Sequence, residues 1–156
     1  MIVEVMNLKV KIVSTNEKYP EIEEKLKQSG FIISDDAEFI FKEVNYVQNT
    51  FIGSIEDEFE VIHISKIIYF EAFDHNVFIK TLEKKYRIKE KLYEVEVILN
   101  DKGFVRINKS QIINKFGIKT LIPSMNSRFN IVMKNNDLLY VTRVYSSKFK
   151  ESIGFK

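Results

Sequence analysis

The sequence predicts a mainly β protein, α+β overall, in which a small strand–helix–strand unit precedes a larger strand-rich domain. Two observations predict this fold. Short runs of Val, Ile, Phe and Tyr recur between polar turns along most of the 156 residues, as in proteins built from short strands. One early segment, by contrast, carries the proline, acidic and glycine signals that begin and end a helix. We expect two parts, residues 1–56 and residues 57–156.

The first part is predicted to be a small acidic unit. Residues 8–13 alternate between apolar and polar side chains and therefore favour a strand. Residues 20–30 favour a helix, because a proline suits the first turn, acids follow at the positive end and a glycine suits the stop. Asp35 and Asp36 are interpreted as a turn rather than a cation site. Strands are expected on either side of that turn, at residues 31–33 and 38–42. The unit is shorter than a phospho-acceptor receiver domain, which needs roughly a hundred residues.

The second part is predicted to hold many strands and two helices. Residues 92–99 place apolar side chains on one helical face, and the polar residues that follow end the helix. Residues 143–153 favour a terminal helix with Gly154 as its stop. Polar residues at 74–76 and 134–137 favour turns between strands. The strands are expected at residues 60–64, 67–71, 77–82, 85–88, 118–122, 127–133 and 138–141.

Residues 102–114 carry the clearest sign of a binding surface. The apolar side chains that can face a core are Phe104, Ile107, Ile112 and Ile113. Arg106 and Lys109 can then project the other way, with Ser110 and Asn114 as neutral hydrogen-bonding groups. Cations beside hydroxyls and amides suit a phosphate backbone or a base edge. A solvated strand edge has the same pattern, so the position of the segment in the fold must decide between the two.

Charge is divided unevenly along the chain. Residues 1–61 hold 6 Lys and Arg against 13 Asp and Glu, a net charge of −7, whereas residues 62–156 hold 18 against 9, a net charge of +9. A basic half of this kind indicates an anionic partner, usually nucleic acid or anionic lipid. The alternative is that the lysines only solvate the surface and that the two halves balance in space.

Composition argues against several other classes of protein. There are no cysteines and only two histidines, His63 and His75, and no glycine-rich phosphate loop is present. We therefore expect no metal, no cofactor, no small-molecule substrate and no enzymatic activity. His63 lies in an alternating strand and is interpreted as structural. No apolar run is long enough to span a bilayer and no secretion signal is visible, so we expect a cytoplasmic protein.

Four segments in a fixed order resemble the LytTR family of bacterial DNA-binding domains, over residues 60–154. Ile67–Ala72 is similar to the opening strand of the family, and Leu92–Val95 is similar to its L-x-E-L helix. Gly103–Asn114 is similar to the F-x-R-x-H-[RK]-S-x-x-V-N signature, and Val141–Tyr145 to the V-S-R-x-Y box. The resemblance implies about ten short strands in small sheets, with loops that enter successive major grooves. It also implies a transcriptional regulator that acts at paired, direct-repeat sites.

The chain departs from the family in two places. Many members have histidine where this chain has Asn108; asparagine still donates and accepts hydrogen bonds. The commonest members join the domain to a receiver domain. The short acidic unit here resembles instead the stand-alone LytTR regulators, which are response-regulator-like but lack phospho-relay control.

Seven residues are candidate DNA contacts: His75, Asn76, Arg106, Asn108, Lys109, Ser110 and Arg143. The resemblance places the base-reading positions in the turn at residues 74–76, at Lys109 and at Arg143. Arg143 can grip guanine or a phosphate in bidentate fashion, unless a carboxylate in the fold occupies it. Arg106 either touches phosphate or forms an internal ion pair. Ser110 is expected to cap a helix or to donate to a phosphate.

The expected partner is double-stranded DNA, bound by a homodimer whose first parts pair through exposed strands. Two alternatives for the first part stay open: it binds a protein that controls activity, such as a membrane-protein antagonist, or its acids cover the basic face. The rival to the whole interpretation is an interaction module that kept the fold and lost DNA binding, for which Asn108 is the best support.

Overall fold

The computed structural model describes residues 8–155, which form two compact units. The first unit ends at Val47 and the second begins at Gln48. The predicted boundary after residue 56 therefore lies too late. The physical reason is strand β4 (Thr50–Ile55), which pairs with strands of the second unit on both of its edges.

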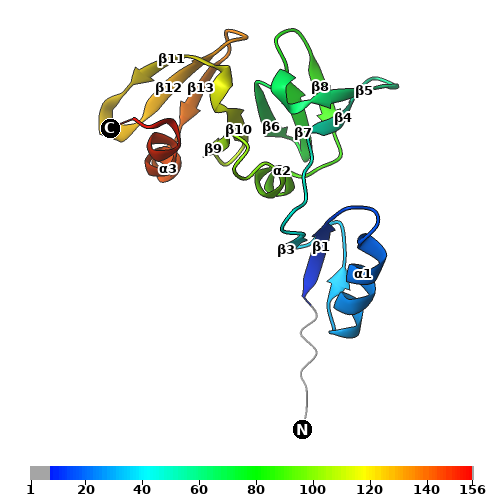
Figure 1. The fold of residues 1–156 in the computed structure, drawn as a ribbon. Coiled ribbons are helices and arrows are strands. Elements are labelled where there is room, and N and C mark those ends of the chain that lie inside the picture. Colours follow the sequence, from blue (N-terminus) through cyan, green and yellow to red (C-terminus); the bar gives the residue numbers. More distant parts are fainter. Residues whose placement is uncertain (1–7, 156) are drawn as a thin grey trace. The chain divides into compact units, whose positions relative to one another are not determined.

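The first unit has the predicted order of strand, helix, strand and strand (Figure 1). Its elements are β1 (Lys9–Val13), α1 (Tyr19–Gln28), β2 (Ile32–Ile33) and β3 (Phe39–Lys42). The three strands form a parallel sheet in the order β2-β1-β3. Helix α1 has Pro20 in its first turn and ion pairs at i, i+4 spacing, such as Glu21–Lys25 at 2.8 Å, which support a short exposed helix.

The second unit contains ten strands in two sheets, which confirms the mainly β fold. A seven-stranded sheet has the order β5-β4-β8-β7-β6-β10-β9, and a three-stranded sheet has the order β11-β12-β13. The strands after β4 are β5 (Glu58–His63), β6 (Tyr69–Phe73), β7 (Asn76–Lys80), β8 (Lys85–Ile88), β9 (Phe104–Asn108), β10 (Gln111–Asn114), β11 (Ile118–Pro123), β12 (Phe129–Met133) and β13 (Leu138–Val141). Helix α2 (Leu92–Ile98) follows β8, and α3 (Arg143–Ile153) follows β13. Three short 3₁₀ turns complete the chain: η1 (Ile64–Lys66), η2 (Lys115–Gly117) and η3 (Met125–Ser127).

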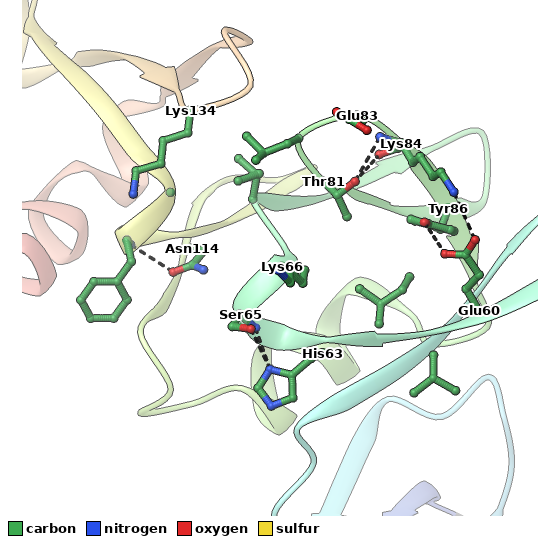
Figure 2. A pocket seen from close by; sticks show the side chains of 16 residues that line it. Glu60, His63, Ser65, Lys66, Thr81, Glu83, Lys84, Tyr86, Asn114 and Lys134 are labelled. Atoms are coloured by element: carbon green, nitrogen blue, oxygen red, sulfur yellow. Dashed lines mark hydrogen bonds and ion pairs between the residues drawn. The ribbon is translucent and has the colours of Figure 1, made fainter.

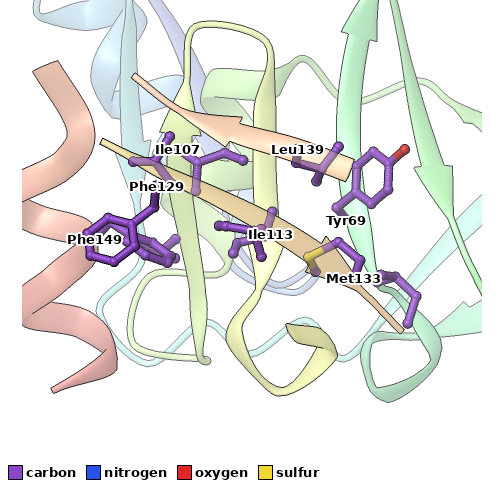
Figure 3. Packing of buried hydrophobic residues seen from close by; sticks show 11 residues of the cluster. Tyr69, Ile107, Ile113, Phe129, Met133, Leu139 and Phe149 are labelled. Atoms are coloured by element: carbon purple, nitrogen blue, oxygen red, sulfur yellow. The ribbon is translucent and has the colours of Figure 1, made fainter. Parts of the chain in front are cut away.

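One end of the seven-stranded sheet packs against the three-stranded sheet and α3 (Figure 3). Ile107 and Ile113 from the large sheet meet Phe129 and Met133 from β12 and Phe149 from α3 in one buried cluster. These side chains are 2% exposed or less, so removing them from water contributes about 25 cal/mol per Å² of apolar area. The cluster fixes the position of β9 and β10 relative to α3.

A partly buried hydrogen bond joins the start of β6 to the β12–β13 turn. The Tyr69 hydroxyl donates to Asp137 Oδ2 at 2.7 Å, and Asn135 Nδ2 donates to the same oxygen at 3.0 Å. Burial and the neighbouring carboxylate raise the pKa of Tyr69 above its ordinary value of 10.0, so the phenol remains a neutral donor at physiological pH.

Strand β4 was not predicted as a strand of this sheet, because a glycine interrupts its run of β-favouring residues. Gly53 pairs with Glu60 of β5. A Cβ atom built at Gly53 would lie 2.6 Å from both Ile62 Cδ1 and Tyr86 Cβ. The glycine therefore permits a close approach of neighbouring side chains, which is a frequent role for glycine inside a strand.

Among residues 8–155, none of the helices has the length and apolar character of a membrane-spanning segment.

Candidate nucleic-acid interface

Three segments that are far apart in the sequence meet at one edge of the second unit. They are the β6–β7 turn with the residue after it (Asp74–Asn76), the β9–β10 turn (Lys109–Ser110) and the first residue of α3 (Arg143). We call this set the loop edge. Two backbone hydrogen bonds bring its parts together, and each has an identifiable cause in the strand pairing.

The first bond joins the β9–β10 hairpin to the start of α3. Gln111 pairs with Asn108 but Ile112 pairs with Arg106, so a bulge leaves Ile107 without a partner on β10. The Ile107 carbonyl instead accepts a hydrogen bond from Thr142 N at 3.0 Å. Bulges commonly redirect a strand in this way. Lys109 lies two residues beyond Ile107, or about 7 Å along an extended chain, and Arg143 directly follows Thr142.

The second bond joins the β9–β10 turn to β6. Ala72 N donates to the Ser110 carbonyl at 2.8 Å, and beside it Gln111 Nε2 donates to Glu71 Oε1 at 2.9 Å. Strand β6 ends one residue beyond Ala72, and the turn of Asp74 and His75 follows at once. The β6–β7 turn is therefore on the same edge as Lys109.

Arg106 points into the protein, and the structure selects the internal ion pair over the phosphate contact. Its guanidinium pairs with Glu96 Oε2 of α2 at 2.9 Å and is 19% exposed. It also donates to the carbonyls of Asn108 and Lys109, and its carbon lies 5.9 Å from the centre of the Tyr145 ring of α3. Arg106 thus holds the β9–β10 turn against both helices.

Asn108 also has an internal role. Its Nδ2 donates to the Tyr140 carbonyl at 3.0 Å and to Gln111 Oε1 at 2.9 Å, and its Oδ1 accepts from Ser110 N at 2.8 Å. The side chain closes the turn and ties it to β13. The expectation that Ser110 caps a helix is wrong, because β10 follows the turn and no helix begins there. Ser110 is an exposed turn residue.

Lys109 and Arg143 have the opposite character. Both side chains are exposed, and within the described residues neither forms an ion pair or a side-chain hydrogen bond. The carboxylate alternative for Arg143 is therefore not observed in this part of the chain. Two uncompensated cations at one edge create a positive potential that attracts an anionic polymer.

The β6–β7 turn has backbone geometry typical of a tight hairpin. Asp74 and His75 have φ values of 49° and 65°, and Phe73 pairs with Asn76 across the turn. Positive φ at both central residues is the signature of a type I′ turn. His75 is exposed, whereas Asn76 is half-buried and donates from Nδ2 to the Asp74 carbonyl at 3.2 Å.

Arg128 is a cation at this edge that the sequence analysis did not identify. Phe129 pairs with Val141, so the preceding Arg128 lies beside Thr142, next to Arg143. Arg128 is exposed. The sequence predicted the hairpin of β12 and β13, but only the strand register shows that Arg128 lies beside Arg143.

A separate hollow lies near the starts of β6 and β8 (Figure 2). Several of its polar side chains bind one another: Glu60 accepts from Tyr86 and from Lys84, and the His63 ring contacts Ser65. The Tyr86 hydroxyl and Lys84 hold the pKa of Glu60 below its ordinary value, so this carboxylate is charged. The His63 side chain accepts from Ser65 N and caps the start of η1.

No group of three or more His, Asp or Glu side chains that could hold a metal ion occurs among the residues that the structure describes.

The profile of the LytTr DNA-binding domain matches residues 57–154, which is more than half of the chain. This chain belongs to the LytTR family. Two relatives are uncharacterised HTH-type transcriptional regulators of Staphylococcus aureus. The one from strain bovine RF122 / ET3-1 is 33% identical over 124 residues, and the one from strain NCTC 8325 / PS 47 is 32% identical over the same length. Each match covers 78% of this chain and 84% of the relative. Because 124 residues exceed the length of the LytTR match, the similarity extends into the region before residue 57.

A solved structure of a LytTr DNA-binding domain from Bacillus cereus has the same fold as the LytTR domain. It is 29% identical, superposes with a TM-score of 0.66 and covers 69% of this chain and 99% of that chain. The names of the Staphylococcus relatives include a helix-turn-helix. In residues 8–155 of this chain, by contrast, strands β9 to β13 separate α2 from α3. Lys109 lies on a hairpin turn, and Arg143 lies at the start of α3.

Proposed function

We propose that this LytTR protein is a sequence-specific regulator of transcription that binds double-stranded DNA at its loop edge. The observation that carries the proposal is the hydrogen bond from Thr142 N to the Ile107 carbonyl, because it places two exposed, unpaired cations on one edge. Lys109 and Arg143 can reach base edges or phosphates there, while His75 and Asn76 extend the same edge. A major groove about 12 Å wide admits such a set of loops.

The seven candidate contacts divide into two roles under this proposal. The exposed residues Lys109, Arg143, His75 and Ser110, with Asn76 beside them, touch DNA. Arg106 and Asn108 position the β9–β10 turn through internal hydrogen bonds, and Arg128 adds a phosphate contact beside Arg143. We assign no catalytic step to any of them, and we place the protein in the bacterial cytoplasm, where its DNA lies.

Arg143→Ala tests the proposal directly. A duplex is first selected from a random pool by the wild-type protein, and its affinity is then measured by fluorescence anisotropy. Loss of a bidentate base contact costs about 1–3 kcal/mol, so we expect Kd to rise roughly 5- to 150-fold, with relaxed selectivity at one base pair. Lys109→Ala should also weaken binding.

Lys119→Ala is the matched control for Lys109→Ala. Lys119 is exposed and lies beside Ile118, which pairs with Met133 at the end of the three-stranded sheet that is remote from Phe129 and Val141. Lys119→Ala should leave the affinity for the selected duplex unchanged. A folded Arg143→Ala protein with wild-type affinity and selectivity would contradict the proposal. An interaction module without DNA binding would show no salt-dependent binding to random duplex at all.

We further propose that the first unit forms a homodimer that matches paired sites. The supporting observation is strand β3, at the edge of its sheet, with Phe39 and Phe41 51% and 45% exposed. An open edge with apolar side chains favours strand pairing with a second copy. Light scattering should show a mass that rises with concentration. A monomer at all concentrations, both free and on selected DNA, would exclude the dimer and would favour a protein partner for this unit.

A further inference from the structure

A line of cations leads from β8 into the start of α2. The exposed residues are Lys85, Arg87, Lys89 and Lys91. The residues between them, Tyr86, Ile88 and Glu90, are buried. We call the four exposed residues the cationic stripe. Lys85 and Arg87 are two residues apart on β8 and share a face of the strand. Lys89 and Lys91 continue the row through the bend that leads to α2.

The stripe carries uncompensated positive charge. Within the described part of the chain, none of its four members forms an ion pair with a carboxylate. The Lys85 ammonium lies 4.3 Å from the centre of the Phe78 ring, a contact that leaves its charge intact. Surface lysines often have nearby acids, so an unbroken row of four free cations indicates an anionic ligand with repeated charges.

The stripe begins at the loop edge. Val77 pairs with Ile88 and Lys80 pairs with Lys85, so Lys89 and Lys91 lie at the end of the sheet that holds the β6–β7 turn. A single hollow is lined by residues of both sets, His75, Asn76, Arg87, Lys89 and Lys91. Lys85 lies at the other end of β8, so the stripe leads away from the loop edge.

The face of the sheet beside the stripe is open. Ser54 pairs with Arg87 and with Phe59, so the three side chains share a face. Phe59 is 73% exposed and Ile52, which is two residues from Ser54, is 57% exposed. Both line the hollow beside Arg87. A ligand can therefore lie along β8 without displacing another element of the second unit.

We propose that the cationic stripe binds the phosphates of the DNA that flanks the base pairs at the loop edge. This inference rests on the proposed function and adds a second, sequence-independent contact to it. Duplex DNA presents a charge for about every 1.7 Å of its axis, which suits a row of four cations better than the few carboxylates of a folded partner do. The DNA site is therefore longer than the base pairs that the loop edge contacts. The additional base pairs lie on one side of them.

The experiment compares two duplexes and two triple variants. The short duplex holds only the selected base pairs, and the long duplex adds ten base pairs on each side. Arg87→Ala, Lys89→Ala and Lys91→Ala together remove three stripe cations. The control variant combines Lys102→Ala, Lys119→Ala and Lys134→Ala, which removes three exposed cations elsewhere on the LytTR domain, so both variants carry the same net charge.

The stripe variant should bind the short duplex with almost the affinity of the wild type. Unlike the wild type, it should not bind the long duplex more tightly than the short one. Each phosphate contact contributes about 0.9 to the slope of log affinity against log salt concentration. Three lost contacts lower that slope by about 2.7, so between 50 and 200 mM salt the wild type loses roughly 40-fold more affinity for the long duplex than the variant does. Hydroxyl-radical footprints should shorten on one side for the stripe variant and stay unchanged for the control.

The outcomes separate the inference from the proposed function. If the wild type binds the short duplex but the stripe and control variants give equal slopes and footprints on the long one, the stripe inference is overturned and the loop edge stands. If the wild type binds neither duplex, both fail. If the stripe variant instead loses only binding to phosphatidylserine vesicles, the stripe is a membrane contact and the inference is also overturned.

Discussion

The two hairpin turns of the loop edge are held in place by different means. The β9–β10 turn is fixed by tertiary contacts: Arg106 and Asn108 tie it to α2, β13 and the neighbourhood of α3. The β6–β7 turn has a backbone conformation of its own, with positive φ at Asp74 and His75. Its hairpin is anchored by backbone and side-chain bonds from β6 to the β9–β10 turn and by the Tyr69 bond near its base. The comparison teaches that one edge of a domain can combine a turn shaped by side-chain contacts with other elements and a turn shaped by the backbone conformation of its own residues.

Arg106→Ala should give the largest effect, because it removes the contacts that hold the β9–β10 turn. It removes the ion pair with Glu96 and the guanidinium bonds to the carbonyls of Asn108 and Lys109. Hydrogen bonds to charged groups contribute about 1.5–3 kcal/mol each, so the free energy of unfolding should fall by about 3 kcal/mol in urea denaturation, with weaker DNA binding. Arg106→Lys keeps the charge but not the planar guanidinium. It should therefore recover only part of the stability and part of the DNA affinity. Unchanged DNA affinity in a destabilised but folded variant would contradict the positioning role.

Tyr69→Phe should give an intermediate effect, because it cuts the tie at the base of the β6–β7 hairpin. The lost bond to Asp137 should lower the free energy of unfolding by about 2 kcal/mol. The folded state raises the pKa of Tyr69, so the neutral phenol favours folding: its contribution is complete below the unfolded pKa and is lost as pH rises above about 10. Urea titrations from pH 8 to pH 11 should show a steeper loss of stability for the wild type than for the variant. Parallel curves would refute this assignment.

His75→Gly should give the smallest effect and the opposite sign. A non-glycine residue in the left-handed region costs about 1 kcal/mol, and Asp-Gly is a preferred type I′ pair. Glycine should therefore raise the free energy of unfolding by about 1 kcal/mol while it removes the imidazole from the DNA surface. Thermal unfolding together with selection of bound duplexes measures both changes. A variant that is destabilised would show that the turn depends on tertiary contacts of His75, and the contrast between the two turns would disappear.

The elements of the fold were largely predictable from local sequence patterns. The terminal helix at residues 143–153 and the strands at residues 85–88 and 138–141 lie where the spacing places them, since periodicity and stop residues are local signals. Strand β4 was missed because Gly53 weakens its local preference, and its pairing partners lie elsewhere in the chain. Because β4 belongs to the second unit, the units divide after Val47 and not after residue 56.

The candidate contacts were predicted as a set, but which of them face solvent and which bind within the fold depended on the tertiary structure. Lys109 and Arg143 lie on one edge, yet no sequence spacing shows that a bulge frees the Ile107 carbonyl for Thr142. Arg106 and Asn108 have the residue types of DNA contacts, but partners distant in sequence turn them inward. Arg128 was overlooked for the converse reason, because only strand register brings it beside Arg143.

The sequence by itself determined the mainly β fold, the LytTR resemblance and the inventory of cations, because hydrophobic period, turn chemistry and charge are properties of short stretches of chain. The tertiary structure alone decided which cations face solvent together and which are used to hold a turn. The physical reason is that the direction and partner of a long charged side chain are fixed by strand register and by hydrogen bonds between segments that the sequence separates.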